Sequence, residues 1–224
     1  MRRVLAYCGF LHGQGTTAPE TGVDNAPVSV LAQDGLQLLW SEVEWPFAQG
    51  KLQQSAVDFH RVIEHVFRRV AVVPFRLLSV FDDLPSLKKF AAEHVTGFVS
   101  DLERLRDMVQ MEAVVYVIAP RVTANSDSGR AYLEQKAGML RFAQGHAAMV
   151  RESIQQVSRE VHIRHVKSGM RIFALVQRGN EGRFRDMVGS VPLPDGVSRR
   201  VSGPWPAAEF LSSAVKMPEI AGQR

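Results

Sequence analysis

The stretch VQMEAVVYVIA at residues 109–119 decides the fold of the second half of the chain. It has the length of one strand, and its closing apolar run is typical of a strand that is buried on both faces. The pattern beyond it predicts, in order, a long helix (129–160), two strands (161–166 and 170–177), a short helix (181–189) and a last strand (197–202). The order β-α-β-β-α-β is that of a ferredoxin-like domain, whose sheet should pack both helices on one face.

The first half of the chain predicts an α+β unit of its own. The expected elements are strands over 4–8, 28–33, 36–43 and 70–80 and helices over 51–69 and 86–107. Asp34-Gly35 favours a two-residue hairpin turn, because both turn positions must tolerate positive φ. Pro74 predicts a bulge or an edge position in its strand, and Gly97 predicts a break or a kink in its helix. We therefore predict an α+β protein of two domains, a mixed α+β domain over 1–108 and a ferredoxin-like domain over 109–224 with a long first helix.

The long helix carries a heptad-like apolar seam. Its positions are spaced three and four residues apart, and they are Leu140, Ala143, Ala147, Val150, Ile154, Val157 and Val161. A helix of about 32 residues would be about 48 Å long, roughly twice the width of a four-stranded sheet. Part of the seam is therefore expected to pack on the first domain, a second copy or a partner. A break at Gly138 or Gly145, giving two ordinary helices, is the alternative.

Composition and charge are those of an ordinary globular chain. Of 224 residues, 46% are apolar, and 27 Lys and Arg against 23 Asp and Glu leave a net charge of +4, too small to indicate nucleic acid by itself. Residues 121–200 hold 14 basic and 7 acidic side chains, a balance of +7, whereas the remainder has a balance of −3. The basic segment is either a solvated face or a surface for an acidic partner. No run approaches the roughly 20 apolar residues that span a bilayer, which favours a cytoplasmic protein without a membrane partner.

The sequence lacks the residue patterns of catalysis and cofactor binding. Cys8 is the one cysteine, so neither a disulfide nor a Cys-based zinc cluster can form within the chain. The seven histidines follow no metal-ligand spacing, and no G-x-S-x-G marks a nucleophile. Glycines 9, 13 and 15 lack the helix N-terminus and the Lys-Ser/Thr pair of a phosphate loop. We therefore expect no enzymatic activity, no cofactor and no metal.

A β-α-β-β-α-β domain with basic residues is also the arrangement of an RNA-recognition module. Such a module carries several aromatic side chains on its third strand, on which bases stack. The corresponding stretch, GMRIFALVQ at 169–177, holds one aromatic residue, Phe173. We therefore expect no nucleic-acid partner.

Three stretches, in this order along the chain, resemble the gas vesicle protein F / gas vesicle protein L (GvpL/GvpF) family. They are GLQLLWSEV (35–43), HRVIEHVFRRVAVVPFRLLSVF (60–81) and GPWPAAEF (203–210). Tyr132-Leu133 is also similar to the Tyr-Leu pair at the start of that family's long helix. Two departures stand out, because Leu78-Ser79 replaces a usual Gly-Thr and Ala207-Ala208-Glu209 replaces a usual Pro-Tyr-Ser.

The resemblance implies an accessory protein of gas vesicles, the hollow protein shells that give cells buoyancy. It implies a two-domain α+β structure with a ferredoxin-like C-terminal domain, in agreement with the pattern of elements. It further implies contacts with the small hydrophobic shell protein and with other accessory proteins, and neither an activity nor a cofactor. The alternative function is that of a ferredoxin-like ligand-binding regulatory domain or a small enzyme.

The family motifs supply the candidate interaction residues, which are Pro74, Phe75, Arg76, Tyr132, Leu133, Gly203, Pro204, Trp205 and Pro206. Pro74 removes a ladder donor and is expected to expose a strand edge. Arg76 is expected to pair with a carboxylate or to close the domain interface. Trp205, held between two prolines, is expected to be a rigid apolar anchor that fills the gap between the domains or contacts a partner.

Overall fold

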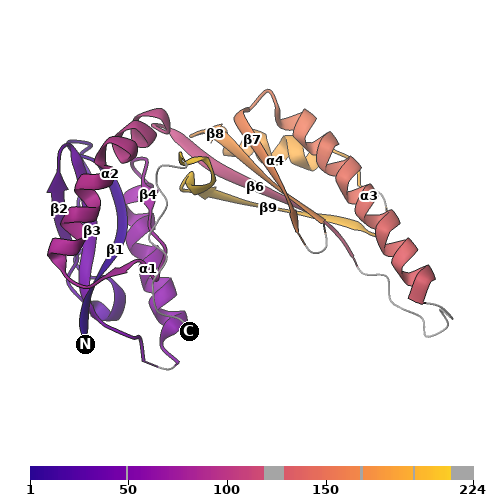
Figure 1. The fold of residues 1–224 in the computed structure, drawn as a ribbon. Helices are drawn as coiled ribbons and strands as arrows, with labels where there is room; N and C mark the ends of the chain where they lie inside the picture. Colours follow the sequence, from indigo (N-terminus) through magenta and orange to yellow (C-terminus); the bar gives the residue numbers. More distant parts are fainter. Residues whose placement is uncertain (49, 119–128, 167–168, 194, 213–224) are drawn as a thin grey trace. The chain divides into compact units, whose positions relative to one another are not determined.

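A computed structural model of the chain describes residues 1–212 apart from 49, 119–128, 167–168 and 194. Backbone contacts divide it into two units, Met1–Asp107 with the residues from Pro206 onward, and Met108–Trp205. Each unit combines helices with one antiparallel sheet, as Figure 1 shows. The α+β fold class predicted from the sequence is therefore confirmed.

The first unit is built around its most buried strand, β1 (Arg2–Leu11). The sheet order is β2 (Ser29–Gln33), β3 (Leu36–Glu44), β1 and β4 (Val73–Pro74), with β5 (Val80–Phe81) also paired to β1. Helices α1 (Leu52–Phe67) and α2 (Leu84–Arg104) both pack against β1. The expected hairpin turn is present between β2 and β3, since φ is +42° at Asp34 and +85° at Gly35.

One predicted strand in this unit is wrong, and a predicted helix break is not observed. The stretch 70–80 does not form one strand, because Phe75 and Ser79 bond to separate parts of β1 and a turn lies between the short strands β4 and β5. The Phe75 N–H donates to the Tyr7 carbonyl, and the Ala6 N–H donates to the Ser79 carbonyl. Helix α2 continues through Gly97 without a break, since the buried face on both sides of it holds Leu87 and Phe98 against the sheet.

The N-terminal end of α2 is capped by Asp83. Its carboxylate accepts hydrogen bonds from the Ser86 hydroxyl at 2.6 Å and from the Ser86 N–H at 2.8 Å. These hydrogen bonds favour the charged carboxylate and lower the pKa of Asp83 below its usual value.

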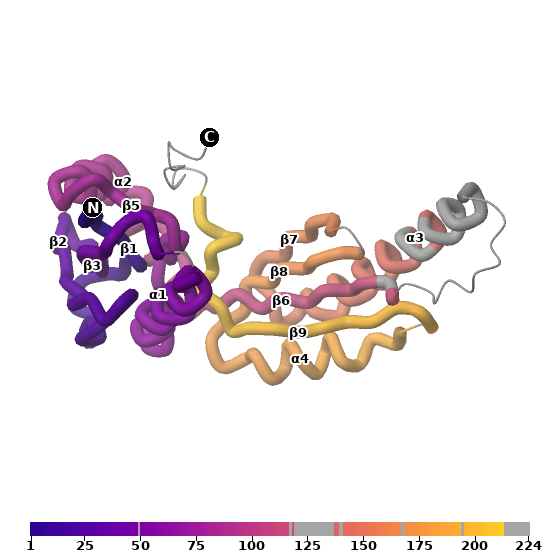
Figure 2. Tube along the Cα trace, turned by 90° about the horizontal axis from the view of Figure 1, so that it is seen from below, coloured from indigo at the N-terminus to yellow at the C-terminus, as the bar shows by residue number. Residues whose placement is uncertain are grey.

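The second unit has the ferredoxin-like order. Its strands are β6 (Met108–Val117), β7 (Ser158–Val166), β8 (Gly169–Gln177) and β9 (Val197–Trp205), and its helices are α3 (Gly129–Ile154) and α4 (Glu181–Ser190). The spatial order is β7-β8-β6-β9, with every neighbouring pair antiparallel. Both helices contact the sheet and each other on one face, and Figure 2 looks onto the opposite face.

Helix α3 is shorter than predicted but continuous. It ends at Ile154 rather than near 160, because the chain turns there and the β-branched residues from 157 onward lead into β7. The alternative break at Gly138 or Gly145 is not observed. The seam from Ala143 to Ile154 is buried and faces the sheet, whereas the side chain of Leu140 lies outside the described residues.

The tail after Trp205 packs with the first unit, and not with the ferredoxin-like domain to which the prediction assigns it. Ala207 and Phe210 are 4% and 3% exposed. The Asp101 carboxylate, itself almost fully buried, accepts hydrogen bonds from the Ser212 N–H at 2.8 Å and the Ser212 hydroxyl at 2.9 Å. Arg104 pairs with Asp101 at 3.1 Å and also donates to the Phe210 carbonyl. Apolar burial and these bonds attach the tail to the end of α2.

Candidate interaction site at the open edge of the first sheet

The Pro74-Phe75-Arg76 motif lies mainly in the core. Phe75 is 4% exposed, and its ring centroid lies 6.0 Å from those of both Phe90 and Phe98 on α2. Pro74 pairs with Cys8 at the edge of the sheet, where its missing N–H breaks no ladder bond to a further strand. The Arg76 side chain is exposed, and no carboxylate of the described residues pairs with it. The expected ion pair of Arg76 is therefore not seen in the described part of the chain.

The Gly203-Pro204-Trp205 motif ends β9 with a close contact to β6. Gly203 has φ +110°, and a Cβ there would lie 2.8 Å from the Gln110 carbonyl oxygen, so this position requires glycine. The Arg185 guanidinium donates to the Gly203 carbonyl at 2.7 Å. Trp205 is 37% exposed, and its indole N–H lies 3.4 Å from the Ser202 hydroxyl. The motif therefore fixes the end of β9 and leaves part of an indole at the surface.

The remaining motif residues add little to a site. Pro206 is the half-buried first residue of the tail. Tyr132 and Leu133 fall within α3, but their side chains lie outside the described residues. The structure thus brings together no single cluster from the sequence-predicted residues within either unit.

The clearest opening for a partner lies at the end of β3. Strand β2 pairs with β3 only from Leu36 to Trp40, so Glu42 and Glu44 continue past the start of β2. Met1 and Trp45 exchange backbone hydrogen bonds. In the alternating pattern of an antiparallel pair, the backbone N–H and C=O groups of Val43 and Ser41 therefore also point toward β1. The N–H and C=O groups of Glu42 and Glu44 therefore point away from β1, toward an open edge.

The residues opposite this edge cannot extend the ladder. Pro27 lies where a partner of Glu42 would fall, and proline has no N–H to donate. The Pro27 carbonyl oxygen instead accepts a hydrogen bond from the Ser41 hydroxyl at 2.7 Å. The Val28 N–H donates to the backbone carbonyl of Glu20. Within the described residues, the backbone of Glu42 and Glu44 thus has no partner at the outer edge.

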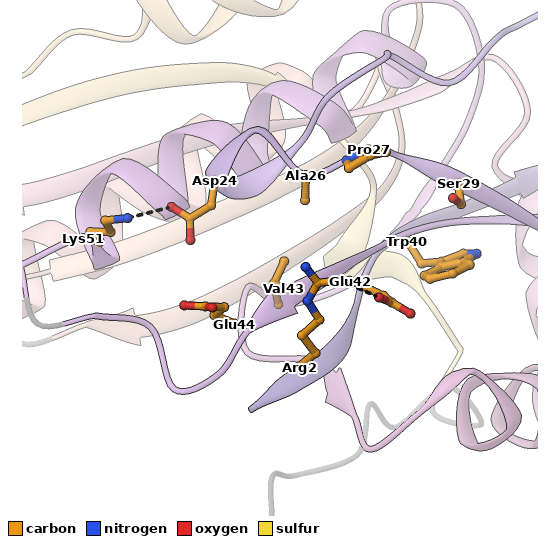
Figure 3. Close-up of a pocket in the computed structure, with 10 residues that line it drawn as sticks. All are labelled: Arg2, Asp24, Ala26, Pro27, Ser29, Trp40, Glu42, Val43, Glu44 and Lys51. Atoms are coloured by element: carbon orange, nitrogen blue, oxygen red, sulfur yellow. Dashed lines mark ion pairs between the residues drawn. The ribbon is translucent and has the colours of Figure 1, made fainter.

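A groove runs along this open edge. Figure 3 shows it between the segment Asp24–Pro27 and the end of β3. Its volume is about 510 Å³, within the range of protein binding pockets. The groove could receive an extended chain, whose own N–H and C=O groups would complete the ladder of β3, as in β-strand addition.

The charges of the groove are partly paired. The Arg2 Nη1 lies 3.6 Å from the Glu42 Oε2, and the Lys51 Nζ lies 3.7 Å from the Asp24 Oδ1. Glu44 forms no ion pair with any described residue. Two copies of β3 that paired through this edge, centred on Val43, would place Glu42 against Glu44 twice, and such like-charge pairs are destabilising. The edge therefore disfavours self-association and favours a strand with basic side chains at alternate positions.

Sequence reasoning missed this edge because no motif marks it. The signals were present, since Pro27 has no N–H to donate and Glu42 and Glu44 place two charges at alternate positions near the end of a largely buried strand. They became interpretable only once the register of β2 against β3 showed which end of β3 remains unpaired.

Elements of other kinds of site are not found in the described chain. No group of three or more His, Cys, Asp or Glu among these residues could hold a metal ion. Burial raises the pKa of the Cys8 thiol to about 12, so it is not a nucleophile at neutral pH. None of the described helices is long and apolar enough to cross a membrane.

Comparison with known proteins supports a family assignment. The family model for the gas vesicle synthesis protein GvpL/GvpF matches residues 3–212. The fold is similar to the crystal structure of the gas vesicle protein GvpF from Anabaena sp. PCC7120, with a TM-score of 0.76, 14% identity, and coverage of 95% of this chain and 97% of that one. It is also similar to GvpF from Microcystis aeruginosa, with a TM-score of 0.73, 16% identity, and coverage of 94% and 99%. No curated protein matches by sequence.

These findings define a two-unit α+β protein of the gas vesicle class. The chain belongs to the GvpL/GvpF family, since the family model covers nearly its whole length. The family resemblance carried by the three sequence stretches is thereby confirmed. At this level the chain is a gas vesicle assembly protein.

Proposed function

We propose that this protein acts in the cytoplasm as an accessory factor of gas vesicle formation, without enzymatic activity, by binding the small shell protein and other assembly proteins. Membership of the GvpL/GvpF family supports a role in gas vesicle formation. The observation that carries the mode of action is the open edge of β3, where Glu42 and Glu44 present unpaired backbone groups to a groove. An extended segment of the shell protein would add there as a further strand.

A proline substitution tests this mode of binding most sharply. Glu44 is the last residue of β3 and its N–H points outward, so Glu44→Pro removes a donor from the open edge and keeps every bond to β1. Ala32→Pro is the matched control, because Ala32 is exposed and its N–H points away from β3 at the outer edge of β2. Both variants should fold, which circular dichroism and thermal unfolding would show.

The assay is co-purification of the full chain with a co-expressed gas vesicle shell protein. We expect the wild type and Ala32→Pro to retain the shell protein and Glu44→Pro to lose most of it. Equal retention by folded Glu44→Pro would overturn strand addition at this edge. Absence of retention by the wild type would overturn direct binding to the shell protein. The double variant Glu42→Gln with Glu44→Gln removes both negative charges and keeps the backbone N–H and C=O groups of the open edge. It therefore distinguishes the contribution of the carboxylates from that of the backbone hydrogen bonds.

A further inference from the structure

The first unit has a second pocket, at the end of β1 opposite to the groove. It is lined by Leu11 and the loop after it, by residues that follow α1 and by residues that follow α2. Its volume is about 450 Å³, within the range of protein binding pockets. All of the lining residues belong to the first unit, so the pocket is formed within one unit.

Two arginine side chains line this pocket without a partner in the described chain. Arg69 is the second residue after α1, and Arg106 is the second residue after α2. Both are exposed, and neither forms an ion pair or a side-chain hydrogen bond with a described residue. Arg104, two residues before Arg106, is instead paired with Asp101. The guanidinium groups of Arg69 and Arg106 are therefore available to a ligand.

The loop after β1 adds two neutral donors to the pocket. The His12 Nδ1 lies 3.0 Å from the Gln37 Nε2, and an amide nitrogen can only donate, so the neutral His12 ring carries its hydrogen on Nε2. The Gln14 amide oxygen is buried without a hydrogen bond, whereas its NH₂ group, which also bonds to no described residue, is open to solvent. A cation is favoured after any helix end, but these two donors are not explained by a helix dipole. The donors of the pocket together suit an oxyanion.

The charge of the pocket indicates which oxyanion it takes. Among the described residues that line it, Asp107 is the acidic one, and it forms no ion pair in the described chain. Two guanidinium groups and one carboxylate leave a net charge of +1. A single carboxylate neutralises this charge and matches the fork of an arginine. A phosphate monoester, with a charge near −2, would exceed it and would be repelled by Asp107.

The apolar part of the lining indicates where the carboxylate comes from. Leu11 and Val70 are half-buried and lie in the same pocket as the donors. A small free carboxylate would leave their remaining surface in contact with water, whereas an acidic side chain in a polypeptide brings neighbouring side chains that cover it.

We infer that this pocket binds an acidic side chain of a partner protein. The carboxylate is held by Arg69 and Arg106, with the His12 Nε2 and the Gln14 NH₂ as further donors, and an apolar residue beside it in the partner covers Leu11. The pocket shares no residue with the groove at the open edge of β3, so this inference does not rest on the proposed function.

The test uses the isotope-labelled full chain and the peptide acetyl-Val-Glu-Val-amide at neutral pH. Binding is followed through the backbone amide resonances of Gly13 and Gln14 in two-dimensional NMR spectra. The control peptide has Gln in place of Glu, and acetate and methyl phosphate are the small anions compared. The protein variant is Arg69→Gln with Arg106→Gln. The matched variant, Lys88→Gln with Lys89→Gln, removes the same charge from exposed positions of α2 outside the pocket.

We expect saturable shifts with the acidic peptide and a Kd in the millimolar range. The arginine variant should raise the Kd at least about tenfold, and the lysine variant should leave it within about twofold. All substituted side chains are exposed, so the amide spectra away from the pocket should stay unchanged and show that both variants are folded.

Four results would overturn the inference. They are the absence of a saturable shift, equal binding of the Gln peptide, an unchanged Kd in the arginine variant, and tighter binding of methyl phosphate than of the acidic peptide. Acetate is expected to bind more than about threefold more weakly than the peptide, because it covers no apolar surface. Binding of acetate within about threefold of the peptide would overturn the protein partner in favour of a small free carboxylate.

Discussion

Replacing Asp101 with alanine should release the tail from the first unit and destabilise that unit. The Asp101 carboxylate is 3% exposed, and it joins α2 to Ser212 through two hydrogen bonds and to Arg104 through one ion pair. Alanine would leave the Ser212 N–H without this acceptor and would leave Arg104 without its carboxylate. The same change would loosen the burial of Phe210, whose carbonyl Arg104 binds.

The magnitude follows from these contacts. Two hydrogen bonds to a charged acceptor contribute about 1.5 kcal/mol each at the low end of their range. The Arg104 guanidinium is 37% exposed, so its pair with Asp101 is screened and adds less than a buried pair would. Alanine regains up to about 0.7 kcal/mol of helix propensity. We therefore expect a loss of about 3 kcal/mol for Asp101→Ala, and about half of that for Asp101→Asn, which keeps one acceptor oxygen.

Urea unfolding followed by tryptophan fluorescence measures this loss. In a Trp205→Phe background the remaining tryptophans, Trp40 and Trp45, both report on the first unit. With a slope near 2 kcal/mol/M, the midpoint should fall by about 1.5 M. Glu103→Ala is the control, since Glu103 is exposed on the same turn of α2 and should change stability by less than about 0.5 kcal/mol. A midpoint for Asp101→Ala that matches the control would refute the role assigned to the tail.

Other consequences concern the core of the first unit. Phe75→Ala should lower the free energy of unfolding in urea by about 3–5 kcal/mol, whereas Arg76→Ala, at an exposed side chain, should leave it unchanged. A larger loss for Arg76→Ala than for Phe75→Ala would contradict the placement of this motif in the core. Because burial raises the pKa of the Cys8 thiol to about 12, a thiol reagent at pH 8 should modify Cys8 only as fast as the chain unfolds. Burial likewise raises the pKa of the Tyr7 phenol, so the unfolded state loses that proton first and stability should decrease as pH rises above 10.0; a flat profile there would contradict this.

Local patterns predicted most of the second unit. The spacing of apolar residues that marks a helix or a strand can be recognised in a short segment of sequence. Here it predicted the six elements of this unit in the right order. The end of α3 was misplaced because Val157 and Val161 continue the apolar spacing of the seam, while β-branching at these positions favours a strand. Whether these residues continue the helix or form a strand is decided by the pairing of β7 with β8. A short stretch of sequence around Val157 does not show that pairing.

The interaction surfaces could not be predicted, because they depend on register. The tail joins the first unit through Asp101 and Ser212, which are 111 residues apart, and no periodicity connects them. The open edge at Glu44 follows from where β2 stops pairing with β3. The basic excess of residues 121–200 is visible in the sequence, but which of its side chains share one face of the second sheet follows only from the register of the four strands. Family motifs identified the protein class, but Phe75 and Gly203 serve packing rather than exposed contact.

The most direct measurement is gas vesicle formation in a strain that lacks this gene and any related gene. Vesicles are counted by electron microscopy after complementation with the wild type, Glu44→Pro or Ala32→Pro at equal protein levels. A role in assembly through the open edge of β3 predicts vesicles with the wild type and with Ala32→Pro, and few or none with the empty strain and with Glu44→Pro. Normal vesicles in the empty strain would contradict the role in assembly, and normal vesicles with Glu44→Pro would contradict the role of the edge.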